Sequence, residues 1–181
     1  MTWLRRLLMV WGVVSLVGAL AGGLWFAQTL HLLWNREAVD ALSVREARAA
    51  LESCNLGGDR LEAIVHSYVS ARSPTGDYLD AYALRVTELD SAQLALKPPN
   101  VWVEWRPGDQ LPPILDAAVR FAGGFLDDRH LSWFPREAEL RSADVRVYPV
   151  SVAFRGDGPT SAVLIFAVPK ERMVFYLAAK I

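Results

Sequence analysis

The chain has 181 residues, of which 52% are hydrophobic, with 19 basic and 20 acidic side chains and one cysteine. The near-neutral charge argues against a nucleic-acid binding protein, which carries a clustered basic excess. One cysteine excludes an intrachain disulfide framework and any multi-cysteine metal site. Residues 1–35 contain no acidic residue and only two basic ones, Arg5 and Arg6. The sequence therefore divides into an apolar N-terminal segment and a body of mixed polarity.

Residues 7–34 form a run of 28 positions without Asp, Glu, Lys or Arg. As an α-helix rising about 1.5 Å per residue, this run would cross a lipid bilayer with some length to spare. Arg5 and Arg6 precede the run, which places the N-terminus in the cytoplasm by the positive-inside rule. The sequence thus predicts a cytoplasmic tail over residues 1–6 and a single transmembrane signal-anchor helix over residues 7–34, followed by a body outside the cytoplasm.

A cleaved signal peptide is the alternative interpretation of the same segment. Ala19-Leu20-Ala21 followed by Gly22 has the small-residue pattern that signal peptidases cut. The apolar run continues past this point to Trp34, however, and a mature protein starting at Gly22 would expose that run to water. We therefore expect an uncleaved anchor. Sixteen of the 19 basic residues are arginine, which favours a GC-rich bacterial genome and hence the bacterial inner membrane, with a periplasmic body.

Small residues recur at helical spacing within this predicted membrane helix. Gly18 and Gly22 form a GxxxG pair, and such pairs let the backbone of a second helix approach closely. The complete set predicts an interface with another membrane helix, either from another subunit or from a second copy of this chain. It consists of Ser15, Gly18, Ala19, Gly22, Gly23 and Ala27.

Residues 35–77 are predicted to form a helical stem next to the membrane. Ser43 and Glu46 have the spacing of a capping box, which predicts the start of a helix that runs to Glu52. A second helix is predicted to start at Asp59 and to end at the turn formed by residues 73–77, because apolar side chains recur there at the spacing i, i+3, i+4 and i+7. These side chains are Leu61, Ile64, Val65 and Tyr68.

Residues 78–181 are predicted to form an extracytoplasmic α+β domain with a mainly antiparallel sheet of about five strands packed by helices. Pro112-Pro113 predicts the start of a helix that ends at Gly123-Gly124, and a short helix is expected after Pro135. Alternating or continuously apolar segments mark the strands. These segments are Tyr78 to Thr87, Val101 to Trp105, Tyr148 to Phe154, Ser161 to Val168 and Met173 to Ala179, with a hairpin loop at Gly156 to Thr160.

The order of these elements resembles that of PAS and Cache sensor domains. This resemblance lies in element order and involves no sequence motif. It implies a ligand-sensing or ligand-binding module outside the cytoplasm.

Reactive side chains are densest at Asp127, Asp128, Arg129 and His130. Two carboxylates and an imidazole can hold a metal ion or act as acid and base. Adjacent residues rarely point at one site, so we expect a solvated loop instead. Cys54 is expected to be a small buried hydrophobic residue. The sequence contains no phosphate-binding loop, no G-x-S-x-G turn and no H-E-x-x-H pair, so we expect no enzyme and no cofactor or metal.

Four aromatic residues are candidates for a partner surface. Trp102 and Trp105 lie on opposite faces of the predicted strand, since side chains alternate along a strand. One of them is expected in the core, and Trp133 and Phe134 would either cover the other or form an aromatic contact surface with it. Packing in the core is the preferred interpretation.

Together these features predict a single-pass membrane-anchored, non-catalytic accessory or assembly subunit of a bacterial membrane protein complex. Its partners would be the lipid bilayer and other membrane subunits or a second copy of itself, with no nucleic acid. The alternative is a PAS- or Cache-like sensing module that signals through a partner, because residues 1–6 are too few for an output domain. A membrane-tethered hydrolase centred on Asp127, Asp128 and His130 is the least favoured hypothesis.

Overall fold

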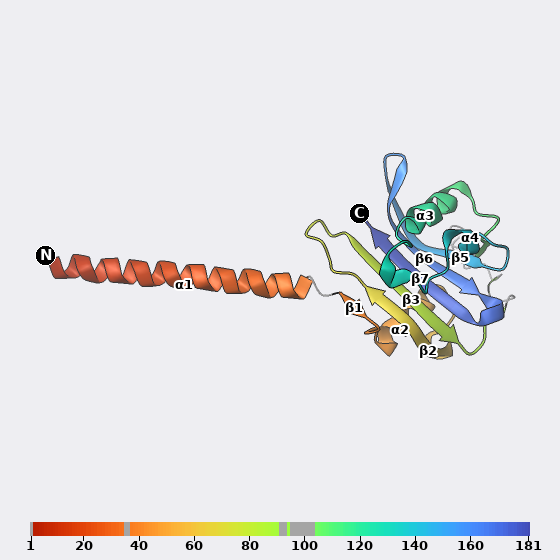
Figure 1. The fold of residues 1–181 in the computed structure, drawn as a ribbon, viewed down its shortest axis with the longest axis horizontal. Helices are drawn as coiled ribbons and strands as arrows, with labels where there is room; N and C mark the ends of the chain where they lie inside the picture. Colours follow the sequence, from red (N-terminus) through yellow and green to blue (C-terminus); the bar gives the residue numbers. More distant parts are fainter. Residues whose placement is uncertain (1, 35–36, 91–93, 95–103) are drawn as a thin grey trace. The chain divides into compact units, whose positions relative to one another are not determined.

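The computed structural model describes residues 2–34, 37–90, 94 and 104–181. The chain forms two compact units, Met1–Arg36 and Glu37–Ile181, which are described separately (Figure 1). The first unit consists of the long helix α1 (Thr2–Trp34). The second, called the sheet domain below, contains every strand in the described part of the chain.

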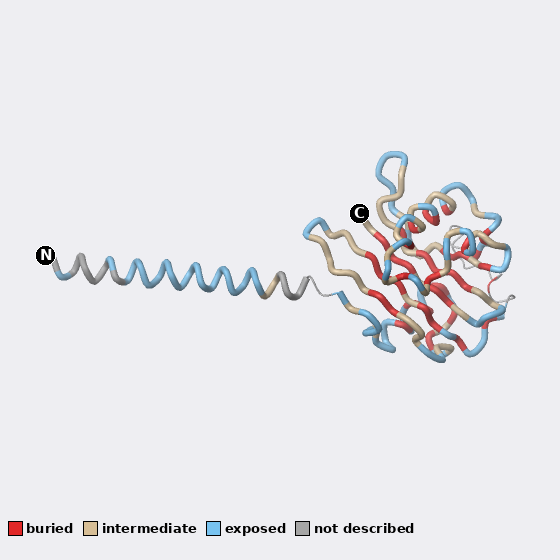
Figure 2. The backbone as a smooth tube through the Cα atoms, in the orientation of Figure 1, coloured by how far each residue is buried: buried red, intermediate tan, exposed pale blue. Residues whose placement is uncertain are grey.

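Helix α1 confirms the predicted N-terminal helix. Its stretch from Trp11 to Leu30 is long and apolar enough to cross a membrane, and none of that stretch is buried inside the chain. Every residue from Trp11 to Gln28 is exposed, as the pale blue tube in Figure 2 shows. By length and composition α1 is therefore a candidate membrane span, a test that signal sequences also pass.

A seven-stranded antiparallel sheet forms the centre of the sheet domain, in the order β1-β2-β3-β7-β6-β5-β4. The predicted α+β class is confirmed, but the expected count of about five strands is too low. The four strands predicted near residues 78, 148, 161 and 173 are present. The strands are β1 (Ala38–Val39), β2 (Leu61–Val69), β3 (Tyr78–Val86), β4 (Arg106–Pro107), β5 (Arg146–Arg155), β6 (Gly158–Val168) and β7 (Met173–Lys180).

The sheet joins two antiparallel groups that are distant in sequence. Strands β2 and β3 form a hairpin, and β5, β6 and β7 form a meander. The two groups meet where β3 pairs with β7 along its whole length, from Tyr78 opposite Lys180 to Arg85 opposite Met173. The C-terminal strand is therefore the middle strand of the sheet.

The helix expected from Asp59 onward is wrong, because this segment forms the short 3-10 helix η1 (Gly58–Arg60) and then β2. Two register shifts interrupt the pairing of β2 with β3, between Leu61 and Ala63 and between Ile64 and His66. As a result Leu61 and Ile64 pack on one face of the sheet, whereas Val65 and Tyr68 pack on the other. Such β-bulges put residues three apart on the same face, which imitates helical spacing.

The structure also differs in other respects from the helical stem that was expected over residues 35–77. Residues 37–77 contain one α-helix, α2 (Val44–Ser53), and belong to the same compact unit as residues 78–181. The expected strand at Val101 to Trp105 lies partly outside the described residues, and its last two positions have no regular structure. Strand β4 begins directly afterwards, at Arg106.

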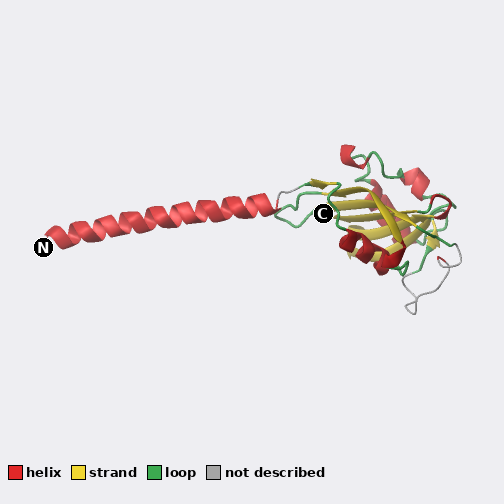
Figure 3. Ribbon diagram, turned by 90° about the horizontal axis from the view of Figure 1, so that it is seen from below, coloured by secondary structure: helices red, strands yellow, loops and turns green. Residues whose placement is uncertain are grey.

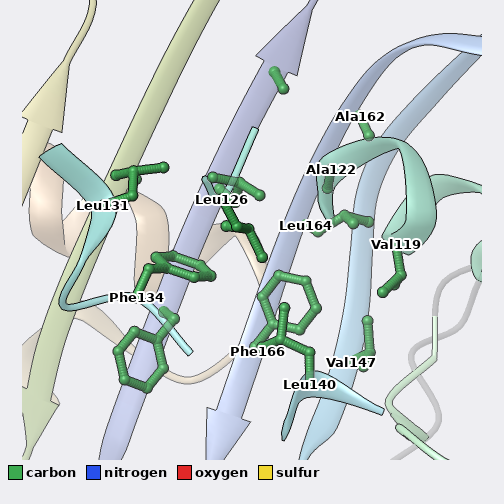
Figure 4. Packing of buried hydrophobic residues seen from close by; sticks show 14 of the residues in the cluster. Val119, Ala122, Leu126, Leu131, Phe134, Leu140, Val147, Ala162, Leu164 and Phe166 are labelled. Carbon is green, nitrogen blue, oxygen red and sulfur yellow. The ribbon is translucent and has the colours of Figure 1, made fainter. Parts of the chain in front are cut away.

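Helices cover both faces of the sheet and create two hydrophobic cores (Figures 1 and 3). On the first face, the α3 face, lie α3 (Pro113–Gly123), the 3-10 helix η3 (Arg129–Leu131) and α4 (Glu137–Leu140). Figure 4 shows Phe134 and Phe166 at the centre of this core. On the second face, the α2 face, Leu51 and Cys54 pack against strand residues such as Leu84. Strand β6 contributes to both cores, as its continuously apolar sequence predicts.

Local signals in the sequence account for the helix starts. The Ser43 hydroxyl accepts a hydrogen bond from the Glu46 amide, and the Glu46 carboxylate accepts one from the Ser43 amide, which confirms the predicted capping box. Pro113 occupies the first turn of α3, where its missing N–H has no cost. The predicted short helix after Pro135 is α4.

Candidate functional site

The small residues of α1 are all exposed in the described chain. A side chain added at Gly18, Gly22 or Gly23 would meet no atom within 4 Å. At about 100° per residue, Ser15, Gly18, Ala19 and Gly22 lie within about 100° of each other around the helix axis. Gly23 and Ala27 extend this surface further around the helix. The six residues therefore form a broad face of small side chains, of the kind that the backbone of a second helix can approach closely.

Three of the four aromatic candidates lie in the described chain, and two of them are core residues. Trp105 is buried on the α2 face, with its ring 5.1 Å from that of Tyr148. Phe134 is 3% exposed and makes edge contacts with Phe166 and Phe175. Trp133 is half-buried, and Trp102 lies outside the described residues. Trp105 thus belongs to the α2 face and Phe134 and Trp133 to the α3 face, so the three described residues do not form one contact surface, and the core interpretation accounts for Trp105 and Phe134.

The cluster at residues 127–130 serves the local structure. An Asp128 oxygen caps η3 by accepting a hydrogen bond from the His130 amide at 2.8 Å, and His130 Nδ1 lies 3.2 Å from the same oxygen. Asp127 points into solvent and lies 3.5 Å from an Arg136 nitrogen. No group of three His, Cys, Asp or Glu side chains in the described residues is arranged to hold a metal ion. Asp128 and His130 thus lie side by side, whereas Asp127 points away from them, and the three do not converge on one site.

Two stacked ring pairs connect this segment to β2, a feature that sequence reasoning missed. His66 stacks on Trp133 with ring centroids 5.2 Å apart, and Tyr68 stacks on His130 at 4.9 Å. The Tyr68 hydroxyl donates to Glu37 at 3.4 Å, and burial, followed by the nearby carboxylate of Glu37, raises the pKa of Tyr68 to about 12. Because the segment from Asp59 onward was expected to be helical, nothing in the sequence indicated that rings of β2 stack on His130 and Trp133.

An ion pair between the partly exposed Arg72 and the buried Asp80 lies on the α2 face near the β2–β3 loop. Arg72 donates to the Asp80 carboxylate at 2.7 Å, and its guanidinium lies 4.3 Å from the centre of the Tyr78 ring. Burial raises the pKa of Asp80, although the hydrogen bond and charge of Arg72 act in the opposite direction. Beside it the rings of Tyr82 and Tyr176 stack 4.8 Å apart. Arg72 follows β2 and Asp80 belongs to β3, so the pair fastens the loop between them to the sheet.

A groove of about 700 Å³ lies between β5 and the first turn of α3. Its lining is predominantly apolar, and its size falls in the range of small-molecule sites, roughly 300–1,000 Å³. The ion pair between Arg106 and Glu104, 2.8 Å long, supplies the charged groups. The sequence gives no hint of this groove, because its walls come from three separate segments. The lining residues are Glu104, Arg106, Pro112, Pro113, Ile114, Leu115, Pro149, Val150, Ser151 and Val152.

The edges of the sheet are poor sites for adding a further strand. Strands β1 and β4 are two residues long, and each pairs with only one end of its long neighbour. Those neighbours, β2 and β5, both carry register shifts, and β5 also contains Pro149. Bulges and proline residues are the features that discourage pairing at a sheet edge. The groove is thus the better candidate for binding in the sheet domain.

No family model matches this chain, and no match was found among curated proteins or solved structures. The resemblance of the element order to PAS and Cache domains therefore stays a prediction.

Proposed function

We propose that this protein is a single-pass membrane-anchored, non-catalytic accessory or assembly subunit of a bacterial membrane protein complex. The observation that carries the proposal is α1, because its apolar stretch from Trp11 to Leu30 has no buried surface inside the chain. A helix that is apolar all around is stable in lipid or against other helices, and not in water. The bilayer and a partner helix are the two environments that meet this need.

The proposed orientation follows from the charges beside the helix. Arg5 and Arg6 precede the apolar stretch, and no acidic residue accompanies them. The positive-inside rule then keeps residues 1–6 in the cytoplasm and places the sheet domain in the periplasm.

The proposed mode of action is binding and not catalysis. The small residues of α1 offer a face for a second helix, and the sheet domain offers a rigid body with two packed cores. Within the described residues, the reactive side chains at positions 127–130 cap η3 or form ion pairs with neighbours. These contacts support a structural use of the cluster that was considered for a hydrolase.

Co-purification tests the proposal directly. The tagged full-length chain would be expressed in bacteria, extracted from carbonate-washed membranes with detergent, and analysed by mass spectrometry for stoichiometric partners. We expect membrane subunits to co-purify with the wild type. Recovery of the chain alone, or of a soluble product starting at Gly22, would overturn the proposal.

A matched pair of variants locates the partner on α1. Replacing Gly18 and Gly22 with Ile fills the small-residue face, whereas replacing Val17 and Leu24 with Phe adds bulk on the opposite side of the helix. We expect the first pair to abolish co-purification and the second to preserve it. Equal behaviour of the two pairs would show that the small-residue face is not the interface.

The groove beside β5 supports a second candidate function, an extracytoplasmic ligand-binding or sensing module. Its volume of about 700 Å³ and apolar walls suit a small organic molecule. Thermal unfolding of the full-length chain in detergent, against a panel of amino acids, carboxylates and short peptides, should then show a raised Tm with one class. A Val152→Phe variant, which narrows the groove, should lose that shift. A flat response across the panel would count against this function.

A further inference from the structure

We draw no further inference here: the strongest candidate, the apolar groove between β5 and the first turn of α3, combines the opposite charges of Glu104 and Arg106 at its wall, and nothing in the structure shows what covers it.

Discussion

Large apolar side chains are exposed along helix α1, whereas the sheet domain buries its largest ones in two cores. In α1, Leu20 is 60% exposed and Trp25 is 70% exposed, whereas Phe166 and Leu177 in the sheet domain are fully buried. The sheet domain encloses two apolar clusters between the sheet and the helices on its two faces. For α1, the described chain supplies no such cover. This difference supports the proposal that α1 is covered by lipid or by a partner helix, since the described residues do not cover it.

The exposed fraction of one side chain does not reveal this difference. Ile114 in the sheet domain is 63% exposed, and Leu20 in α1 is 60% exposed, so the two side chains have a similar exposure. Single exposed apolar residues are normal on soluble proteins and need no partner. A continuous apolar surface around a helix is different, because water cannot solvate it without cost. The extent of the surface, and not the exposure of any one residue, therefore sets the two regions apart.

The largest effect is expected when a core side chain of the sheet domain is removed. Phe166→Ala should lower the free energy of unfolding by about 3–5 kcal/mol, because it leaves a cavity on the α3 face. Phe154→Ala is the matched control, since Phe154 is 43% exposed and lies near the β5–β6 turn. It should cost less than about 1 kcal/mol. Urea unfolding of the full-length chain in detergent measures the free energy of unfolding of both variants. Similar losses of stability in Phe166→Ala and Phe154→Ala would contradict the assignment of Phe166 to the core.

A charge placed in each region distinguishes their environments. Arginine at the centre of a membrane helix costs about 2.5–3.5 kcal/mol on insertion scales. Leu20→Arg should therefore reduce the membrane-integrated fraction of the protein, as measured by carbonate extraction. Ile114 is about as exposed as Leu20, and Ile114→Arg should leave the membrane-integrated fraction unchanged. If Leu20→Arg remained fully integrated, the proposal of α1 as a membrane span would fail.

Most of the fold could be predicted because its signals are local. The capping box at Ser43 predicts the start of α2, the two prolines before Ile114 predict the start of α3, and period-two alternation predicts β3 and β5. Strand β2 could not be predicted in this way, since its two bulges convert the alternation into helical spacing. Strands β1 and β4 contain two residues each and are defined only by the neighbours they pair with.

The candidate sites were less predictable than the fold, because each joins segments that are distant in sequence. The groove takes its walls from residues near 105, 113 and 150, and no local pattern in the sequence indicates that these segments lie together. The contact of Arg72 with Asp80 depends on the path of the β2–β3 loop. By contrast, the burial of Trp105 and Phe134 agrees with the expectation that large aromatic residues fill cores.

Helix α2 provides a smaller test within the sheet domain. It has 10 residues, so its own hydrogen bonds do not sustain it and its first turn depends on the Ser43 cap. Ser43→Ala should lower the free energy of unfolding by about 1 kcal/mol. Ser53→Ala is the control, because the Ser53 hydroxyl bonds a carbonyl of the same helix and caps no free amide. Urea unfolding should show the larger loss for Ser43→Ala, and the reverse order would contradict the role of the cap.

Two carboxylates of the sheet domain should respond to pH in opposite directions, because hydrogen bonds from arginine dominate the environment of Asp116 and burial dominates that of Asp80. Hydrogen bonds from Arg141 and Arg120 lower the pKa of Asp116, so its contribution to stability is present at neutral pH. This contribution is lost as the pH falls through the folded-state pKa of Asp116, which lies below the ordinary value of 3.8. Burial raises the pKa of Asp80, so its contribution is present below its unfolded pKa. That contribution is lost as the pH rises through the folded-state value.

Unfolding at pH 3 and pH 7 separates the two groups. Asp116→Asn should reduce the gain in stability between pH 3 and pH 7, because it removes a contribution that appears as the pH rises. Asp80→Asn should increase that gain, because it removes a contribution that disappears over the same range. The difference between the two pH values cancels the constant effect of each substitution on packing. If both variants changed the gain in the same direction, burial would not dominate the environment of Asp80.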